Sequence, residues 1–565
     1  MWWLFLVGPV CCRPCVRQRR WLGFPWRETD RLSKRQAKAV YWQDAPSPRG
    51  QLVLIPTALE ELIPSDHPVR LVDEILDQLD WSQWESKYNG RSGQPPIHPS
   101  VLAKVLLFAM IRRIRSSRSI EYEVKHSIDF MWLTSGRRID HTTISEFRRN
   151  NSEELRGIFK NMIKLAMDLG MANLSELCID GTRILGNANR YKTWTSARLA
   201  KALEQLDAQL VEALKSLEEN DSLNEDLFGQ DLSADRLPEA VANLQERREK
   251  LAAAMETTQA MDAARQANGT KGPAQLPKTD TDSRILPNKE GGFAANYTPM
   301  ATTETVSGLI VDAEVVIGNV EHDQLSDIVD RVEAEFEAEV ARVMADKAYT
   351  TGENLADAEV KGFELVGPIA ETKRDNNPAE RDDLSQPVAD ADIPRLPINP
   401  QTKRFDKAAF VYDAEADSYY CPAGKKLPHR VTENTKRGDK TVAKKVYTCN
   451  ECAGCPLAGL CRTNPESERG REVKDDEYEG ARRRQRAWMK TEEAQAAYAR
   501  RQHFGELPFA VIKVMFDMRR FLLRGIEGVG QEWRWAATAF NLKKLMSRWA
   551  ELRAELANTS TAAAS

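Results

Sequence analysis

The sequence has no long hydrophobic run, since none of its apolar segments reaches the roughly 20 residues that a helix needs to cross a bilayer. The first twelve residues are apolar, but they lack the basic start and small-residue cleavage site of a signal peptide, so we expect a cytoplasmic protein. Nine cysteines in 565 residues are too few for a disulfide scaffold. A strong excess of one charge is also lacking, because the formal net charge is -4. Any contact with nucleic acid must therefore come from local basic clusters.

The order of the elements predicts an α/β protein with large insertions. Residues 52–171 have apolar positions at helical spacing, and residues 195–265 predict a long helical hairpin. Between and after these segments come short apolar runs that predict strands, at 174–179, 297–302, 309–316, 341–345 and 363–369, with a helix over 323–337. Residues 266–295 are expected to form a linker and residues 372–410 a loop, while 480–550 are helical again.

Two aspartates directly follow predicted strands. Asp180 ends one apolar run and Asp346 ends another. A sheet edge positions side chains rigidly, and two neighbouring carboxylates would offer the oxygen ligands that Mg²⁺ prefers. Taken singly, an aspartate in such a place more often only starts a turn after its strand, and the neighbouring residues of each are what favour a site. A third carboxylate from a helix would complete a site for two-metal phosphoryl transfer.

Three short motifs carry a resemblance to a known family. Asp180 begins Asp-Gly-Thr, and Asp346 lies within Ala345–Tyr349, Ala-Asp-Lys-Ala-Tyr. A third stretch has the spacing shared by Tyr498, Arg501, Glu506, Phe509 and Lys513. With these motifs the chain resembles the DDE transposases of bacterial insertion sequences, most of all the branch numbered 1182, over roughly residues 50–550.

The resemblance implies a ribonuclease-H-like catalytic core that binds Mg²⁺ (or Mn²⁺), with two ions held by Asp180, Asp346 and Glu506. The branch usually has proline directly after the glutamate, whereas here Leu507 intervenes before Pro508. Because proline disfavours a helix interior, we expect the helix to begin or kink near Glu506, and Glu492 and Glu493 are the alternative third acids.

The N-terminal helices resemble the part of this family that recognises the terminal inverted repeats of the element. Short basic helices can reach into a major groove and bind phosphates. The alternative is a helical bundle with solvated arginines. The residues expected at DNA are Arg112, Arg113, Arg115, Arg118, Arg148 and Arg149, together with Tyr498, Arg501 and Lys513 near the catalytic glutamate.

Five cysteines lie between positions 421 and 461, and four thiolates could hold one structural Zn²⁺. The family shows Cys421, Cys452, Cys455 and Cys461, which leaves Cys449 as the spare. The alternative is that these are reduced cysteines of an intracellular loop.

The function predicted from the resemblance is a DNA transposase that binds the element's inverted repeats, cleaves the ends and joins them to target DNA, as a homodimer on double-stranded DNA. A nuclease without strand joining and an inactive DNA-binding remnant are the rival hypotheses. The predicted parts are a disordered extension (1–50), an all-α DNA-binding domain (51–171), the first part of the core (172–194), a helical insertion (195–275), the continued core (276–410), a Cys-rich knuckle (411–470), the C-terminal helical part of the core (471–553) and a disordered tail (554–565).

Overall fold

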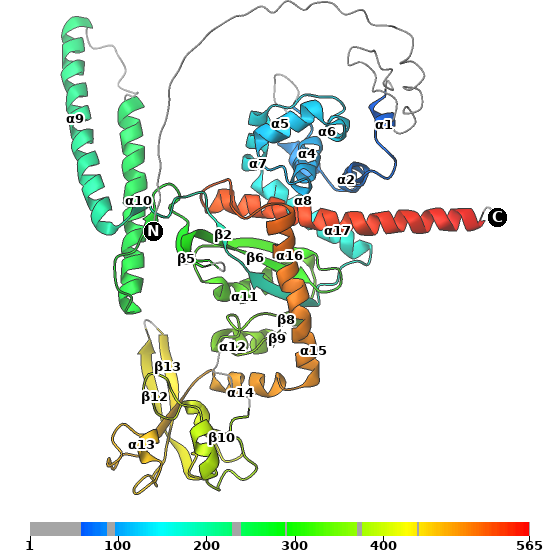
Figure 1. Ribbon diagram of the computed structural model, residues 1–565. Coiled ribbons are helices and arrows are strands. Elements are labelled where there is room, and N and C mark those ends of the chain that lie inside the picture. The colour runs from blue at the N-terminus through cyan, green and yellow to red at the C-terminus, as the bar shows by residue number, and fades with distance from the viewer. Residues whose placement is uncertain are drawn as a thin grey trace, which may run out of the picture. The chain divides into compact units, whose positions relative to one another are not determined.

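The computed structural model describes residues 58–87, 96–228, 239–288, 291–369, 376–437 and 440–563 (Figure 1). All of them belong to one unit of the chain, Ala58–Ser565. The extension expected to be disordered, residues 1–50, lies outside the described residues. None of the described helices is both long and apolar enough to span a bilayer.

The N-terminal part is all-α, as predicted. Helix α4 (Pro99–Ile111) is buried along almost its whole length, because its sequence is apolar on every side. Helix α7 (His141–Asn150) begins where the side chain of Asp140 accepts hydrogen bonds from the backbone N–H groups of Thr142 and Thr143, at 2.8 and 3.0 Å, as an N-cap does. The other helices of this part are α1 (Leu59–Leu62), α2 (Pro68–Asp77), α3 (Ser82–Ser86), α5 (Ser117–His126), α6 (Ile128–Leu133) and α8 (Ser152–Asp168).

The main sheet has seven strands, and five of them lie in the spatial order β7-β6-β1-β8-β9, while the short strands β2 (Ile184–Leu185) and β5 (Arg284–Pro287) also pair with β6. Strands β1 (Glu176–Gly181), β6 (Phe293–Glu304) and β7 (Ile310–Val316) are antiparallel neighbours. On the other side of β1, strands β8 (Arg342–Met344) and β9 (Glu364–Val366) run parallel to it. Parallel strands need a crossover, and helix α12 (Gly352–Lys361) connects β8 to β9, while η2 (Glu321–Gln324) and α11 (Leu325–Phe336) lead from β7 to β8.

A helical hairpin is inserted between two short strands that pair with each other. Helices α9 (Ser196–Phe228) and α10 (Glu239–Ala267) lie side by side, as predicted for this segment (Figure 1). Strands β3 (Thr193–Trp194) and β4 (Leu276–Pro277) close its base. The linker expected over 266–295 therefore contains β4 and also β5 (Arg284–Pro287), which pairs with β6.

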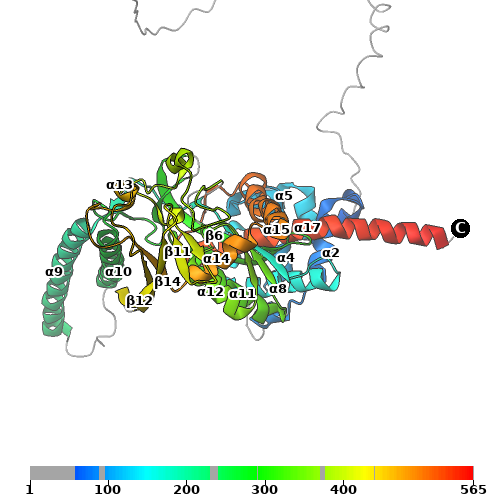
Figure 2. The same ribbon diagram turned by 90° about the horizontal axis from the view of Figure 1, so that it is seen from below.

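A second, antiparallel sheet occupies the cysteine segment, and the sequence analysis did not predict it. Its strands are β10 (Val411–Asp413), β11 (Ser418–Tyr420), β12 (Lys426–Arg437), β13 (Lys440–Thr448) and β14 (Glu472–Asp476), in that spatial order (Figure 2). The cysteines from 449 onward belong to the connection between β13 and β14, which holds the short helix α13 (Ala458–Cys461). Within the described part of the predicted loop over 372–410, residues 376–410, the helical elements are two 3₁₀ turns, η3 (Asp390–Arg395) and η4 (Lys407–Ala409).

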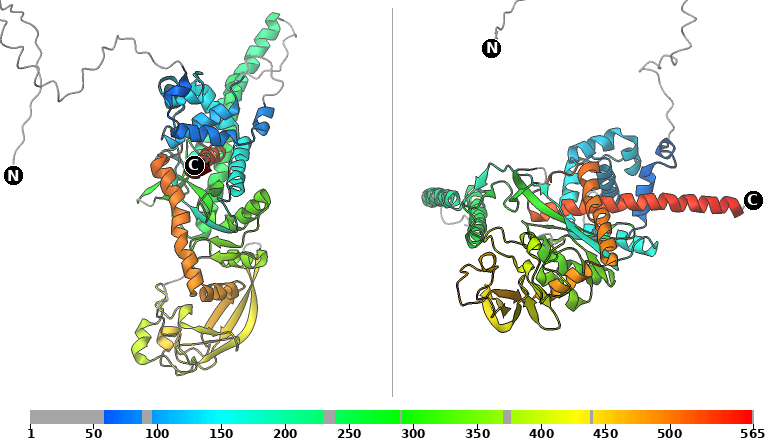
Figure 3. Two further views of the ribbon diagram at one scale, coloured as in Figure 1. Left: turned by 90° about the vertical axis from the view of Figure 1, so that its right-hand side faces the viewer. Right: turned by 60° about the horizontal axis from the view of Figure 1, so that its bottom comes forward.

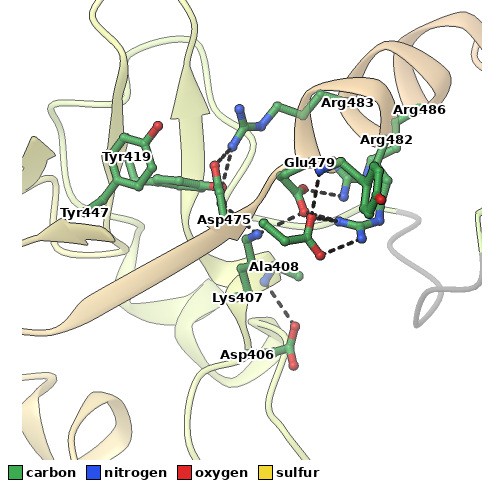
Figure 4. Close-up of polar contacts among 12 residues, drawn as sticks. Asp406, Lys407, Ala408, Tyr419, Tyr447, Asp475, Glu479, Arg482, Arg483 and Arg486 are labelled. Atoms are coloured by element: carbon green, nitrogen blue, oxygen red, sulfur yellow. Dashed lines mark hydrogen bonds and ion pairs between the residues drawn. The ribbon is translucent and has the colours of Figure 1, made fainter. Parts of the chain in front are cut away.

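A charged network joins this second sheet to helix α14 (Glu479–Trp488) (Figure 4). The buried Glu479 binds Lys407 at 3.0 Å, Arg482 at 2.9 Å and Arg486 at 2.8 Å. Asp475 of β14 binds Lys407 at 2.7 Å and also pairs with Arg483. Both carboxylates are thus buried among cations, which offsets their desolvation.

From Glu492 to Met515 the chain is helical (Figure 3), and two π-turns interrupt its α-helical period. Helix α15 (Glu492–Arg501) passes into a π-turn, η5 (Gln502–Glu506), then α16 (Leu507–Ala510) and a second π-turn, η6 (Val511–Met515). Pro508 has no N–H for the carbonyl of Phe504, and the Thr303 hydroxyl donates to that carbonyl instead, at 2.9 Å. The π-turn η5 and the Thr303 side chain thus accommodate the proline without ending the helix. The interruption expected near Glu506 is a change of helical period and not the start of a helix.

The last helix, α17 (Ile526–Ala563), packs against both α4 and β7. Its Trp535 ring lies 6.1 Å from that of Phe147, and the Trp533 indole N–H donates to Met300 O in β6 at 2.8 Å. The N-terminal helices and the main sheet consequently share one hydrophobic core, so residues 51–171 are not a separate domain. Helix α17 also extends to Ala563, through most of the tail that was expected to be disordered.

Candidate active site

Asp180 and Asp346 occupy equivalent positions on neighbouring parallel strands. In the register of β1 and β8, Cys178 lies opposite Met344, and each aspartate follows two residues later. Adjacent strands lie about 4.8 Å apart, so the two carboxylates leave the sheet at the same edge. Each also accepts a local backbone hydrogen bond, Asp180 from Gly181 N and Asp346 from Ala348 N, at 2.8 and 2.7 Å.

Helix α15 and η5 pack directly over Asp180. Arg501 forms an ion pair with the Asp180 carboxylate at 3.1 Å, and both side chains are mostly buried. Gly505 permits this approach, because a Cβ at that position would lie 3.3 Å from Asp180 Oδ2 and 3.3 Å from Cys178 Sγ. A glycine within a helical run is the sequence signal that could have indicated this contact.

Glu506, the predicted third acid, directly follows Gly505, and its side chain is exposed. The alternative acid Glu493 instead pairs with Arg342 at 2.6 Å. Arg342 begins strand β8, whereas Asp346 follows the other end of that strand, so Glu493 is at the wrong end for this site. Glu492 opens the same helix one residue earlier. Over the described ranges of the chain, no three His, Cys, Asp or Glu side chains are gathered closely enough to ligate one metal ion.

Two residues that the sequence analysis did not assign to the site lie beside Asp180. The buried Tyr349 hydroxyl has no hydrogen-bond partner among the described residues, and one Glu321 oxygen is likewise buried without one. Burial, and then the charges of Asp180, Glu321 and Asp346, raise the pKa of Tyr349 well above its ordinary value. Tyr349 is therefore a neutral donor within an acidic group. Its place in the Ala-Asp-Lys-Ala-Tyr motif was visible in the sequence, whereas Glu321 had no comparable signal.

The remaining residues of the third motif are also directed at the end of β1. The Lys513 ammonium donates to the hydroxyl of Thr182, in the Asp-Gly-Thr motif. Tyr498 is half-buried, and burial raises its pKa. Because two π-turns intervene, these residues do not share the single face that an ideal helix would give them.

The predicted DNA-binding arginines of the N-terminal helices separate into two groups. Arg148 is buried and donates to the carbonyl of Arg115 at 2.8 Å, and Arg115 in turn pairs with the buried Glu532 of α17 at 2.6 Å. These two side chains are bound inside the protein. The exposed members are Arg112, which also pairs with Asp129, and Arg113, Arg118 and Arg149.

The five cysteines of the second sheet line one small cavity. The sulfur of Cys421 accepts a hydrogen bond from Lys425 N at 3.3 Å, and that of Cys452 accepts one from Arg471 N at 3.4 Å. Burial raises the pKa of Cys461 to about 11 and that of Cys449 to about 12. Cys449 lines the cavity with the other four, so the structure does not single it out as the spare.

Two family models match the chain. Residues 57–150 match a transposase domain of the family DUF772, and residues 420–546 match a transposase DDE domain. The chain is thus a transposase with a DDE domain. The second match includes Glu506, Arg501 and Lys513 of this transposase, while Asp180 and Asp346 lie before it.

No curated protein matches the transposase sequence. Among solved structures, it is similar to a piggyBac transposase synaptic complex with hairpin DNA, with 11% identity and a TM-score of 0.28. That similarity covers 85% of this chain and 74% of the other. At such a TM-score it carries no structural argument, and the assignment rests on the two matched domains.

Proposed function

We propose that the transposase cleaves DNA at the ends of its element and joins the freed 3′-hydroxyls to target DNA, with Asp180, Asp346 and Glu506 as the catalytic carboxylates. The observation that supports this most directly is the equivalent position of Asp180 and Asp346 on the parallel strands β1 and β8. The order of the main sheet, three antiparallel strands followed by two parallel ones, supports a ribonuclease-H-like core. Gly505 against Asp180 favours Glu506 over the other acids as the third member.

The three side chains carry carboxylate oxygens, which are the ligands that the hard cations Mg²⁺ and Mn²⁺ prefer, and they would have to draw closer together to share an ion. Two such ions, when bound, would activate the attacking oxygen and stabilise the leaving one. The chain's own residues prepare the site around them. Arg501 neutralises the charge of Asp180 and fixes the orientation of its carboxylate. The Tyr349 hydroxyl can donate a hydrogen bond to either aspartate or to the substrate.

We also propose that the exposed arginines of the N-terminal helices bind the inverted repeats in double-stranded DNA. Arg149 lines a large open cavity with Arg156 of α8, with Arg524 and Gly525 before α17 and with Arg534 of α17, and the same cavity is also lined by the carboxylates of Glu153, Asp282, Glu314 and Glu527. Guanidinium groups and backbone N–H groups are the usual phosphate contacts. The transposase would act as a homodimer, one chain for each element end, in the bacterial nucleoid. Arg115 and Arg148 are left out of this surface because their side chains are bound internally.

The function is tested with a purified chain and a DNA fragment that carries the element's ends and flanks. We expect Asp180→Asn, Asp346→Asn and Glu506→Gln each to lower Mg²⁺-dependent cleavage by a factor of at least about 10³, since each removes charge from the site. Glu492→Gln is the matched control and should cleave normally. Binding of the ends, followed by gel shift, should persist in all four variants.

The other outcomes distinguish the rival functions. Cleavage without strand-transfer products would show a nuclease, and end binding without any cleavage by the parent chain would show an inactive remnant. If Glu506→Gln cleaves normally while Asp180→Asn does not, Glu506 is not the third acid.

We further propose a structural zinc ion in the cavity of the five cysteines. The support is the shared cavity and the two backbone N–H groups that point at sulfur and would stabilise thiolates. Zinc ligation requires four sulfurs to converge at about 2.3 Å from the ion. Metal analysis should find one zinc per chain, lost in Cys452→Ser with Cys455→Ser, whereas Cys178→Ser should retain it. Because the thiols have raised pKa values, zinc retention should weaken as pH falls. A zinc-free chain with an unchanged melting temperature would contradict the proposal.

A further inference from the structure

A basic groove leads away from the candidate active site along strand β2 (Ile184–Leu185). It consists of two adjoining cavities, of about 260 and 490 Å³, which share Leu185 in their walls. Lys513 lies at the end next to Asp180. Six further cations line the groove: Arg183, Arg190, Lys192, Arg519, Arg520 and Arg524. No aspartate or glutamate is among the described residues that line either cavity.

Five cations of this groove, Arg190, Lys192, Arg519, Arg520 and Arg524, are exposed to a ligand. Arg183 pairs with Glu321, but the other five are exposed and have no carboxylate partner within the described part of the chain. Arg190 donates only to the Phe293 carbonyl and the Tyr191 hydroxyl, and Arg524 donates to Asn187 O. A concentration of positive charge without counter-charge is the signature of a phosphate-binding surface.

The floor of the groove is held rigidly, although the chain on one side of it is not part of a regular helix. Leu185 N donates to Arg519 O and Phe521 N donates to Leu185 O, at 3.2 and 2.8 Å, so residues 519–521 lie along β2 as an added strand edge. The buried Glu532 accepts from the backbone of Leu522 and Leu523. Residues 519–523 enter these contacts through their backbone groups, so the arginine side chains at 519 and 520 are not needed for them.

An aromatic side chain stands between two residues that line the groove. Tyr191 is 76% exposed, and the Arg190 guanidinium lies 4.5 Å from the centre of its ring. An exposed aromatic ring is costly in water and is the usual platform on which an unpaired base stacks. The larger cavity has the size of a pocket for one small ligand, about 300–1,000 Å³, which suits separated nucleotides better than the side of a double helix.

We propose that this groove binds single-stranded DNA, namely the strand that continues past the scissile phosphate once its end is unpaired at the active site. Phosphates would pair with Lys192, Arg519, Arg520 and Arg524, and a base would stack on Tyr191. The inference rests on the proposed function, because the groove begins at the Lys513 and Arg183 end of that site.

Binding is measured by fluorescence anisotropy on the full chain, with EDTA present so that no DNA is cut. The probes are a labelled single-stranded oligonucleotide and a blunt duplex of the same sequence. Arg519→Glu with Arg520→Glu should weaken single-strand binding by about tenfold or more. The slope of log K against log salt concentration should become smaller by about 1.4, because each phosphate contact contributes about 0.7. Duplex binding should change by less than about twofold. Arg247→Glu with Lys250→Glu, on the exposed helix α10, is the charge-matched control and should bind both probes normally.

Tyr191 provides a second, independent variant. Tyr191→Leu should weaken single-strand binding by about fivefold or more, because it removes the stacking surface, and Tyr191→Phe should restore it. Equal losses for both probes in the arginine variant would show that the groove holds duplex, and unchanged single-strand binding in both variants would show that it holds no DNA. Either result overturns the inference while cleavage by the parent chain still supports the proposed function. A parent chain that binds neither probe would overturn both.

Discussion

Two adjacent arginines at the end of helix α7 have different roles. Arg148 is buried and donates a hydrogen bond to the carbonyl of Arg115. The guanidinium of Arg115 in turn donates to the carboxylate of Glu532. Arg149 is exposed and lines the cavity with Arg156. In the sequence the pair looks uniform, because helical spacing alone does not say which neighbour faces the core when both are charged.

This difference can be tested by substituting each arginine singly. Arg148→Ala should lower the free energy of unfolding by about 2 kcal/mol, since it removes a buried hydrogen bond from a charged donor. Arg149→Ala should leave the free energy of unfolding within about 0.5 kcal/mol but weaken binding to element ends, with a smaller salt dependence. Denaturant unfolding and gel shift give the two readouts. An Arg148→Ala chain of normal stability would mean that this side chain does not bind internally.

The residues of the candidate active site were predictable to the extent that they follow simple local patterns. Asp180 and Asp346 come directly after apolar strands, and the structure places both strands side by side in parallel. Tyr349 and Glu321 could not be assigned from the sequence, because what distinguishes them is burial beside Asp180, which depends on how η2 and the β8–α12 connection pack.

At the scale of elements, helix α14 depends on a buried glutamate at its first residue. Burial opposes the charge of Glu479, but Lys407 and Arg486 outweigh it and lower the pKa to about 2. A carboxyl whose folded pKa lies below its unfolded value of 4.5 adds stability above that value. The stabilisation is therefore complete above about pH 4.5 and is lost as the pH falls toward about 2.

Glu479→Gln should therefore lower the free energy of unfolding by about 3 kcal/mol at neutral pH, because it leaves buried cations uncompensated. The loss should shrink as the pH is lowered through the range from 4.5 to about 2. Thermal unfolding across that pH range measures both effects. Glu477→Gln, at the exposed turn before the helix, is the control and should be close to neutral. An equal loss at every pH would show that packing, and not charge, is responsible.

Elements with a strong local period were predicted closely, and those defined by distant partners were not. Helices α4, α6 and α7 and the hairpin of α9 and α10 follow from periodicity and caps. Strands β12 and β13 were missed because their polar residues, such as Lys436 and Thr441, give no apolar alternation. The π-turns around Pro508 were missed because they depend on Thr303, about two hundred residues earlier in the chain.

At the scale of the whole molecule, the order of the parts was predictable from the sequence, but the hydrophobic core that they share was not. The expectation of a separate DNA-binding domain treated residues 51–171 as having their own core. In the structure, Phe147 packs on Trp535. The side-chain amide of Asn541 in α17 donates to the carbonyl of Ile310 in β7 at 2.7 Å and accepts from its N–H at 2.9 Å. The aromatic residues and the asparagine of α17 were visible in the sequence, yet their partners lie hundreds of positions away.

The shared core has a consequence for the order in which the chain is made. Helix α17 is synthesised last, although α2, α4 and α8 near the beginning pack against it. Proteins emerge from the ribosome at about 5–20 residues per second, and domains normally fold as they appear. Here the first helices must wait for the last one, so a polypeptide that terminates before residue 526 leaves them with an open apolar face. We therefore expect prematurely ended chains to be cleaved by proteases more readily than the complete transposase.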